Sequence, residues 1–142
     1  MIQRILIING PNLNLLGRRE PEVYGSVSFE TYFEEIKNKF PETRLDYFQS
    51  NHEGALIDYL HQNGFSENTG IILNAGGLSH TSISLRDAVS AIDIPVVEVH
   101  ISDIYHREPF RQLSYLTDVC AAHFIGKGLD GYRMAIEYLR EL

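Results

Sequence analysis

Short runs of branched apolar residues recur along the chain and alternate with longer amphipathic stretches. The segments RILIIN, GIILN and PVVEVH are nearly continuous in Ile, Leu and Val. Strands of this kind are usually covered on both faces, as in parallel sheets flanked by helices. We therefore expect a largely parallel sheet. Its predicted strands are Arg4–Asn9, Arg44–Gln49, Gly70–Asn74, Pro95–His100 and Val119–Ile125.

The stretches between these runs have the period of amphipathic helices. Ser28 is a candidate N-cap for the first helix, Ser50 and Glu53 form a candidate capping box at the second, and Gly64 is placed to end it. Strands that alternate with helices predict one flavodoxin-like, doubly wound α/β domain over residues 1–142, with parallel strands in the order 2-1-3-4-5. The predicted helical faces are Phe29, Tyr32, Phe33, Ile36 and Phe40, then Leu56, Ile57 and Leu60, then Leu85, Ala88, Val89 and Ile92, and last Tyr132, Ala135, Ile136 and Leu139.

The composition limits the partners of this chain. Its 142 residues are 44% apolar and 22% charged, as in ordinary globular proteins. No apolar run approaches the roughly 18 residues of a membrane span, and the N-terminus reads as a strand rather than a signal peptide. A net charge of −7 argues against nucleic-acid binding. The single cysteine, Cys120, is expected to be a buried apolar residue, and we expect a cytoplasmic protein.

The segment that follows the first predicted strand, Asn9–Gly25, is unusually long. Connections in such folds commonly have about two to six residues, and ligands bind at the carboxyl ends of the strands, beside the point where the strand order reverses. Adjacent arginines, Arg18 and Arg19, lie in the middle of the segment. It is either a lid that closes over an anion or a solvated loop whose arginines pair with Glu20 and Glu22.

Tyr24 lies near the end of the same segment and is one of eight tyrosines. Most tyrosines are packing residues, and this is one interpretation of Tyr24. A free tyrosine titrates near pH 10, and a guanidinium within about 4–6 Å favours the phenolate. A tyrosine beside arginines in a closing loop is therefore also a candidate general base.

Polar residues follow the third predicted strand as well. Asn74 stands where the strand emerges, and the paired glycines after it allow the backbone to approach a ligand closely. His80 is a weaker candidate on spacing alone. Asp87 is typical of a solvated helix residue.

After the fourth predicted strand, Glu98 and His100 are two residues apart and share one face of the strand. A carboxylate beside a histidine fixes its orientation and favours its protonated form, as a general acid requires. The alternative is a polar pair without a catalytic role. Arg107 and Arg111 add positive charge near the same edge. The histidines lack the spacing of metal ligands, so we expect no metal site.

Taken together, these segments resemble the signature of the type II 3-dehydroquinate dehydratases, and the resemblance extends over essentially the whole chain. It implies a flavodoxin-like fold and an anti elimination of water from 3-dehydroquinate through an enolate, giving 3-dehydroshikimate in the shikimate pathway of aromatic amino-acid biosynthesis. It also implies that no metal, cofactor or Schiff base takes part. The residues that carry it are INGPNL at 8–13, LGRREP at 16–21, YG at 24–25, LNAGG at 73–77, SHTS at 79–82, LRDA at 85–88 and VEVHIS at 97–102.

The resemblance assigns a role to each catalytic candidate. Tyr24 would remove the C2 proton and Arg19 would stabilise the developing negative charge. His100 would protonate the departing C1 hydroxyl with the support of Glu98. Asn12 would help to hold a water at the enolate oxygen.

The same resemblance implies how the substrate is bound and how the chains assemble. Members of the family form dodecamers, arranged as four trimers, and we expect a homododecamer in which Asp87 reaches the site of a neighbouring subunit. The substrate carboxylate would bind two backbone amides. The implied substrate-binding residues are Asn74, His80, Asp87, Arg111 and the backbone of Ile101 and Ser102.

Two departures from the family pattern stand near Arg111. Pro109 replaces a frequent glutamate, and Asp103 replaces a frequent asparagine. Proline removes an amide donor and fixes φ, so the local backbone that leads to Arg111 is expected to depend on Pro109.

The rival interpretations are a nucleotide- or flavin-binding module, which would have a Ser, Thr and Gly run after the first strand, and a receiver or scaffold domain, which would have acidic residues there.

Overall fold

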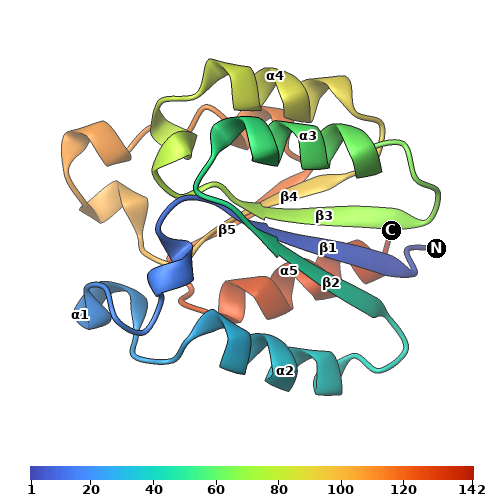
Figure 1. The fold of residues 1–142 in the computed structure, drawn as a ribbon, viewed down its shortest axis with the longest axis horizontal. Coiled ribbons are helices and arrows are strands. Elements are labelled where there is room, and N and C mark those ends of the chain that lie inside the picture. The colour runs from blue at the N-terminus through green and yellow to red at the C-terminus, as the bar shows by residue number, and fades with distance from the viewer.

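A computed structural model describes residues 1–142 and contains a five-stranded sheet in the order β2-β1-β3-β4-β5 (Figure 1). All neighbouring strands are parallel. β1 and β3 run in register, with Asn9 opposite Asn74 at their carboxyl ends. The predicted fold class and strand order are confirmed. The strands are β1 (Arg4–Asn9), β2 (Arg44–Gln49), β3 (Thr69–Asn74), β4 (Val96–His100) and β5 (Ala122–Ile125).

Helices cover both faces of the sheet, with α3 and α4 on one face and α2 and α5 on the other (Figure 1). Ile5 and Ile7 of β1 pack in the core on the side of α2 and α5, whereas Leu6 and Ile8 pack on the side of α3 and α4. This division arises because successive side chains of a strand point to opposite faces. The long helices are α2 (Phe29–Lys39), α3 (Glu53–Asn63), α4 (Ile83–Ala91) and α5 (Asp130–Arg140).

Of the two N-terminal caps predicted from the sequence, the cap of α2 is confirmed and the cap of α3 is wrong. Ser28 caps α2, and its hydroxyl accepts a 3.2 Å hydrogen bond from the N–H of Thr31. The capping box predicted at Ser50 and Glu53 does not form, because α3 begins at Glu53 itself. Its carboxylate instead accepts a hydrogen bond from the hydroxyl of Ser82.

Gly64 ends α3 as predicted, but it does not adopt the left-handed conformation that usually favours glycine at the end of a helix. Its φ is −70°, which any residue can adopt. A Cβ at this position would lie 2.3 Å from a side-chain carbon of Ile92. The glycine is therefore required by the close packing of the α3 end against Ile92.

β5 is shorter than predicted because its expected first residues form another structure. Thr117–Val119 is a 3-10 helix, and the N–H of Cys120 bonds back to the carbonyl of Leu116 at 3.1 Å. Cys120 is half-buried rather than buried. Burial, with the negative charges of Glu98 and Asp118, raises the pKa of the thiol to about 12, which makes it unreactive at neutral pH.

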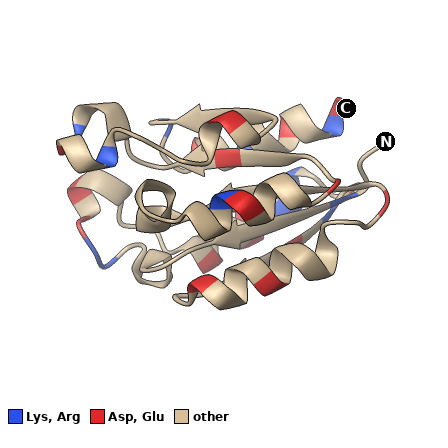
Figure 2. Ribbon diagram, turned by 90° about the horizontal axis from the view of Figure 1, so that it is seen from above, with Lys and Arg blue, Asp and Glu red and all other residues tan.

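Both termini lie at one end of the sheet, and the loops at the carboxyl ends of the strands lie at the other (Figure 1). In the view of Figure 2, acidic residues recur along the helices and basic residues are scattered rather than gathered into one patch. None of the helices is long and apolar enough to cross a membrane.

Candidate active site

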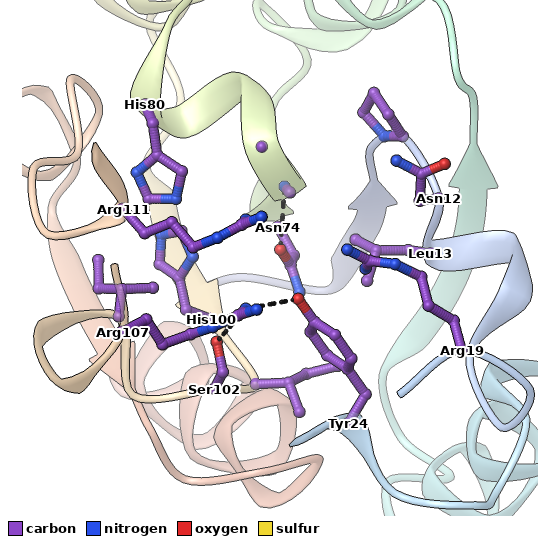
Figure 3. Close-up of a pocket in the computed structure, with 15 residues that line it drawn as sticks. Asn12, Leu13, Arg19, Tyr24, Asn74, His80, His100, Ser102, Arg107 and Arg111 are labelled. Atoms are coloured by element: carbon purple, nitrogen blue, oxygen red, sulfur yellow. Dashed lines mark hydrogen bonds between the residues drawn. The ribbon is translucent and has the colours of Figure 1, made fainter. Parts of the chain in front are cut away.

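A pocket opens at the carboxyl ends of β1, β3 and β4, where the strand order reverses (Figure 3). Its walls come from the long segment after β1, the glycine turn after β3 and the loop after β4. This is the position at which doubly wound sheets bind ligands. The predicted site residues that line the pocket are Asn12, Arg19, Tyr24, Asn74, His80, His100, Ile101, Ser102 and Arg111.

The turn after β1 brings its backbone directly against β3. The N–H of Gly10 donates a 2.7 Å hydrogen bond to the carbonyl of Asn74, and a Cβ on Gly10 would lie 2.4 Å from the carbonyl oxygen of Ala75. Only glycine permits this approach. Asn12 follows in a left-handed conformation with φ 70°, and its N–H donates to Oδ1 of Asn51 at 2.9 Å. The Asn12 side chain thus stands at the rim of the pocket (Figure 3).

The middle of the long segment turns sharply on both sides of a short helix, α1 (Pro21–Tyr24), that the sequence did not predict. Gly17, Glu20 and Gly25 all have positive φ values, of 95°, 41° and 85°. Pro21 supplies a first helical residue that needs no N–H partner. The turns direct the ring of Tyr24 into the pocket (Figure 3).

The two adjacent arginines of this segment have different surroundings. The guanidinium carbon of Arg19 lies 4.9 Å from the centre of the Tyr24 ring, and its Nη2 lies 3.3 Å from a carboxylate oxygen of Glu20. Arg18 is exposed and its side chain has no ion pair or hydrogen bond. Arg19 therefore forms one of the ion pairs that the solvated-loop interpretation expected and also lines the pocket, whereas Arg18 is exposed and forms neither pair.

Arg107 is the important contact that sequence reasoning did not include among the site residues. Its Nη1 donates a 2.7 Å hydrogen bond to the hydroxyl of Tyr24, and its guanidinium carbon lies 5.5 Å from the ring centre. The same Nη1 lies 3.4 Å from the hydroxyl of Ser102. The available signal was the position of Arg107 after the strand that carries His100. That position indicated charge near the site but could not identify the partner.

Glu98 and His100 form the pair that their spacing predicted. His100 Nε2 lies 2.7 Å from Oε2 of Glu98, and both side chains are buried. The carboxylate accepts this hydrogen, so Nδ1 is the ring nitrogen without a protein partner. Glu98 does not line the pocket itself and acts on it through the imidazole.

Two hydroxyl groups behind Glu98 were not found from the sequence. Ser114 and Thr117 both donate hydrogen bonds to the carboxylate, the latter at 2.5 Å. Burial raises the pKa of Glu98, but the hydrogen bonds from His100, Ser114 and Thr117 outweigh it, so the pKa lies below its usual value. The site therefore holds a buried negative charge directly behind His100.

His80 lies above His100, with ring centres 6.0 Å apart and planes at 28°. Burial lowers the pKa of His80, with further lowering from the charges of His100 and Arg111. A neutral ring must donate from Nδ1 to the carbonyl of Leu113, 2.7 Å away. Nε2 of His80 is then an acceptor, suited to a hydroxyl group of a ligand.

Arg111 reaches the pocket despite the departure at Pro109. Pro109 is the first residue of a 3-10 helix, where its missing N–H is not needed. The N–H of Arg111 bonds to the carbonyl of Glu108 at 2.8 Å, and Nε lies 3.2 Å from the Glu108 carboxylate. Pro109 is thus compatible with the turn that carries Arg111.

The backbone after β4 presents two unused donors. The N–H groups of Ile101 and Ser102 donate to no other protein atom, and both residues line the pocket.

Asp103, the other departure from the family pattern, caps the next 3-10 helix by accepting a 3.1 Å hydrogen bond from the N–H of Tyr105. Asp87 is exposed on α4 and does not line the pocket of its own chain. No cluster of His, Cys, Asp or Glu in the structure could hold a metal ion.

The sheet and the cationic pocket at its switch point define a flavodoxin-like α/β protein with a site for a small polar anion. A sequence profile described as dehydroquinase class II matches residues 3–140. The chain is 51% identical to the 3-dehydroquinate dehydratase of Halothermothrix orenii, over 96% of this chain and 93% of that protein. It is 45% identical to the catabolic 3-dehydroquinase of Podospora anserina, over 97% and 94%. The chain belongs to the class II dehydroquinase family.

A solved structure agrees with this assignment. The crystal structure of the type II dehydroquinase from Butyrivibrio crossotus superposes with a TM-score of 0.94 at 41% identity, covering 98% of each chain. The family predicted from the motifs is therefore confirmed, together with the fold.

Proposed function

We propose that this chain is a 3-dehydroquinate dehydratase that eliminates water from 3-dehydroquinate to give 3-dehydroshikimate, a step of the shikimate pathway towards aromatic amino acids. One observation carries the proposal. A phenol contacted by two guanidinium groups lines the same pocket as a histidine that is backed by a buried carboxylate. A base and an acid so arranged suit an elimination next to a ketone.

In this proposal Tyr24 is the base. It removes a proton from C2, beside the C3 ketone, and the electron pair of the C–H bond forms an enolate. Arg19 against the ring and Arg107 at the hydroxyl place two positive charges beside the phenol oxygen, where they stabilise the developing enolate charge. Asn12, at the rim, holds the water that hydrogen-bonds to the enolate oxygen.

His100 is the acid of the second step. The enolate electron pair forms the C1–C2 double bond, the C1–O bond breaks, and His100 supplies the proton with which the hydroxyl leaves as water. Nε2 is held by Glu98 at 2.7 Å, so Nδ1 is the atom available to the substrate. The buried carboxylate of Glu98 fixes the orientation of the ring, so that Nδ1 faces the pocket.

The substrate carboxylate binds at the backbone N–H groups of Ile101 and Ser102. Convergent amides of this kind form an anion-binding nest, and a chain with a net charge of −7 needs local donors to attract an anion. Asn74, His80 and Arg111 line the same cavity, and in this proposal they bind hydroxyl and carboxylate oxygens of the substrate.

We also infer that the chains assemble as a homododecamer of four trimers, with Asp87 completing the site of a neighbour. The exposure of Asp87 outside its own pocket supports this arrangement. Light scattering on the purified protein should give the mass of twelve chains. A monodisperse monomer with full activity would contradict the assembly.

The reaction itself is tested by following the ultraviolet absorbance of the conjugated product. Purified enzyme with 3-dehydroquinate should give a steady rise in absorbance, and no rise with folded protein would refute the proposal. Tyr24→Phe should lower kcat by about 10²–10⁴-fold, the range of general base catalysis, while substrate binding measured by calorimetry persists. Tyr105→Phe is the control, since Tyr105 is exposed and does not line the pocket.

A further inference from the structure

Beneath the pocket, a buried tyrosine joins helix α5 to the ends of two strands. Tyr132 lies in the first turn of α5 and is completely buried. Its hydroxyl accepts a 2.9 Å hydrogen bond from Nδ2 of Asn74 and donates one of 2.8 Å to Oδ1 of Asn9. Asn9 and Asn74 are register partners on β1 and β3. One hydroxyl therefore links both strands at the point where the sheet reverses its order.

The position of each proton in this network follows from a single backbone group. The N–H of Gly76 can only donate, and it donates to Oδ1 of Asn74 at 3.2 Å. The Nδ2 end of Asn74 must then face Tyr132, whose oxygen accepts. The one hydroxyl proton of Tyr132 is left for Asn9.

The opposite arrangement of the Asn74 amide is excluded by the same groups. A turn of 180° would place Nδ2 against the N–H of Gly76, so that two donors would face each other. Such a mismatched contact in a partly buried place is unfavourable. Burial also raises the pKa of Tyr132 well above its ordinary value, so the hydroxyl keeps its proton at neutral pH.

The geometry points to Tyr132 as a positioning residue, which holds the Asn74 amide so that one Nδ2 hydrogen stays free for an oxygen of the substrate. Nδ2 carries two hydrogens, and Tyr132 uses only one of them. Asn74 lies in the middle of the pocket, between Arg107 and Arg111 on one side and Arg19 on the other (Figure 3). This inference rests on the proposed function, because the substrate is the dehydroquinate assigned there.

The matched test compares two tyrosines of the same aromatic cluster, Tyr132, which is buried, and Tyr47, which is half-buried. Tyr132 and Tyr47 both pack against Phe29, with ring centres 5.0 and 4.6 Å away, but only the hydroxyl of Tyr132 bonds to the amide of Asn74. Tyr132→Phe should raise KM for 3-dehydroquinate about tenfold or more, with kcat within about threefold of wild type. Tyr47→Phe should leave KM within about twofold. Equal KM changes in the two variants would overturn the assignment.

A double-mutant cycle separates positioning from general loosening of the core. If Tyr132 acts through Asn74, Tyr132→Phe should cause no further rise in KM once Asn74→Ala is present. Two KM effects that multiply independently would refute the coupling. Thermal unfolding of each variant shows whether the comparison is made on folded protein.

A second replacement covers the case in which Tyr132→Phe is too unstable to assay. 4-Fluorophenylalanine at position 132 fills most of the volume of the hydroxyl but accepts hydrogen bonds poorly. The same rise in KM is therefore expected, and a wild-type KM would overturn the inference.

Failure of the proposed function is distinct from failure of this inference. In the first case the wild-type enzyme gives no product. In the second it gives product, and the variants at position 132 have a wild-type KM.

Discussion

The guanidinium of Arg107 donates a 2.7 Å hydrogen bond to the hydroxyl of Tyr24, across 83 residues of sequence. This contact joins the segment after β1 to the loop after β4 and closes the pocket from one side. Arg19 contacts the face of the same ring. A phenol between two cations is the feature that most clearly separates this site from an ordinary polar cleft.

Arg107→Gln should therefore lower kcat for dehydration by about ten- to a hundredfold, the usual range for a hydrogen bond to a charged group. Arg18→Gln is the matched control, because Arg18 belongs to the same segment but contacts neither Tyr24 nor the pocket. Steady-state kinetics on both variants decides the matter. A similar loss of kcat in the two variants would contradict a specific role for the contact between Arg107 and Tyr24, because removing either positive charge would then have the same effect.

Glu98→Gln tests the buried carboxylate behind His100. Ser114 and Nε2 of His100 share Oε2 of Glu98, whereas Thr117 bonds to Oε1, so a glutamine oxygen in the place of Oε2 keeps the first two bonds and turns its NH2 group to Thr117. The negative charge is lost in either orientation of the amide. The imidazole loses the buried negative charge behind it while it donates its proton, and kcat should fall by about ten- to a hundredfold. Glu137→Gln on the exposed face of α5 should have no effect on turnover.

The same carboxylate makes a prediction for acid stability. Its pKa in the folded protein lies below the ordinary value of 4.5, because hydrogen bonds from His100, Ser114 and Thr117 outweigh the effect of burial. Its contribution is therefore present above pH 4.5 and is lost as the pH falls through the folded pKa. As the pH is lowered below 4.5, the urea concentration at the unfolding midpoint of the wild type should decrease. In Glu98→Gln this decrease should be smaller. An identical pH profile for both proteins would show that other carboxylates control the transition.

The fold could be predicted because its signals are local. Apolar runs such as Ile5–Ile8 indicate strands covered on both faces, and the spacing of Glu98 and His100 places both on one face of β4. Where the prediction failed, a tertiary contact prevailed over a local pattern. Glu53 has the spacing of a capping box, yet its carboxylate binds Ser82 of another helix start.

The site could be predicted as a set of residues but not as a set of contacts. The resemblance supplied the residues that line the pocket, and strand ends explained why they meet. The hydrogen bonds from Arg107 to Tyr24 and from Asn74 to Tyr132 join residues that are 83 and 58 positions apart in the sequence. No periodicity or spacing encodes such pairs, because they depend on the packing of side chains in the folded chain.

Gly10→Ala should destabilise the protein by about 1–3 kcal/mol, the range for overpacked sites. A Cβ there would lie 2.4 Å from the carbonyl of Ala75, and backbone on both sides cannot yield without moving β1 from β3. Gly54→Ala is the control, since Gly54 lies within α3 with open space around it and should gain up to about 1 kcal/mol from helix propensity. Urea unfolding measures both. A Gly10→Ala variant as stable as wild type would contradict the close approach.

Two tyrosines around Phe29 predict how stability changes in alkali. Burial raises the pKa of both Tyr32 and Tyr47 to about 12, from the usual value of 10. Between pH 10 and about 12 the unfolded chain has lost protons that the folded chain still holds, so the free energy of unfolding must fall as the pH rises. The urea midpoint, followed by circular dichroism, should decline over this range. The decline should be shallower when both tyrosines are changed to phenylalanine and unchanged in Tyr105→Phe, whose ring is exposed. A double variant that declines as steeply as wild type would place the titrating groups elsewhere.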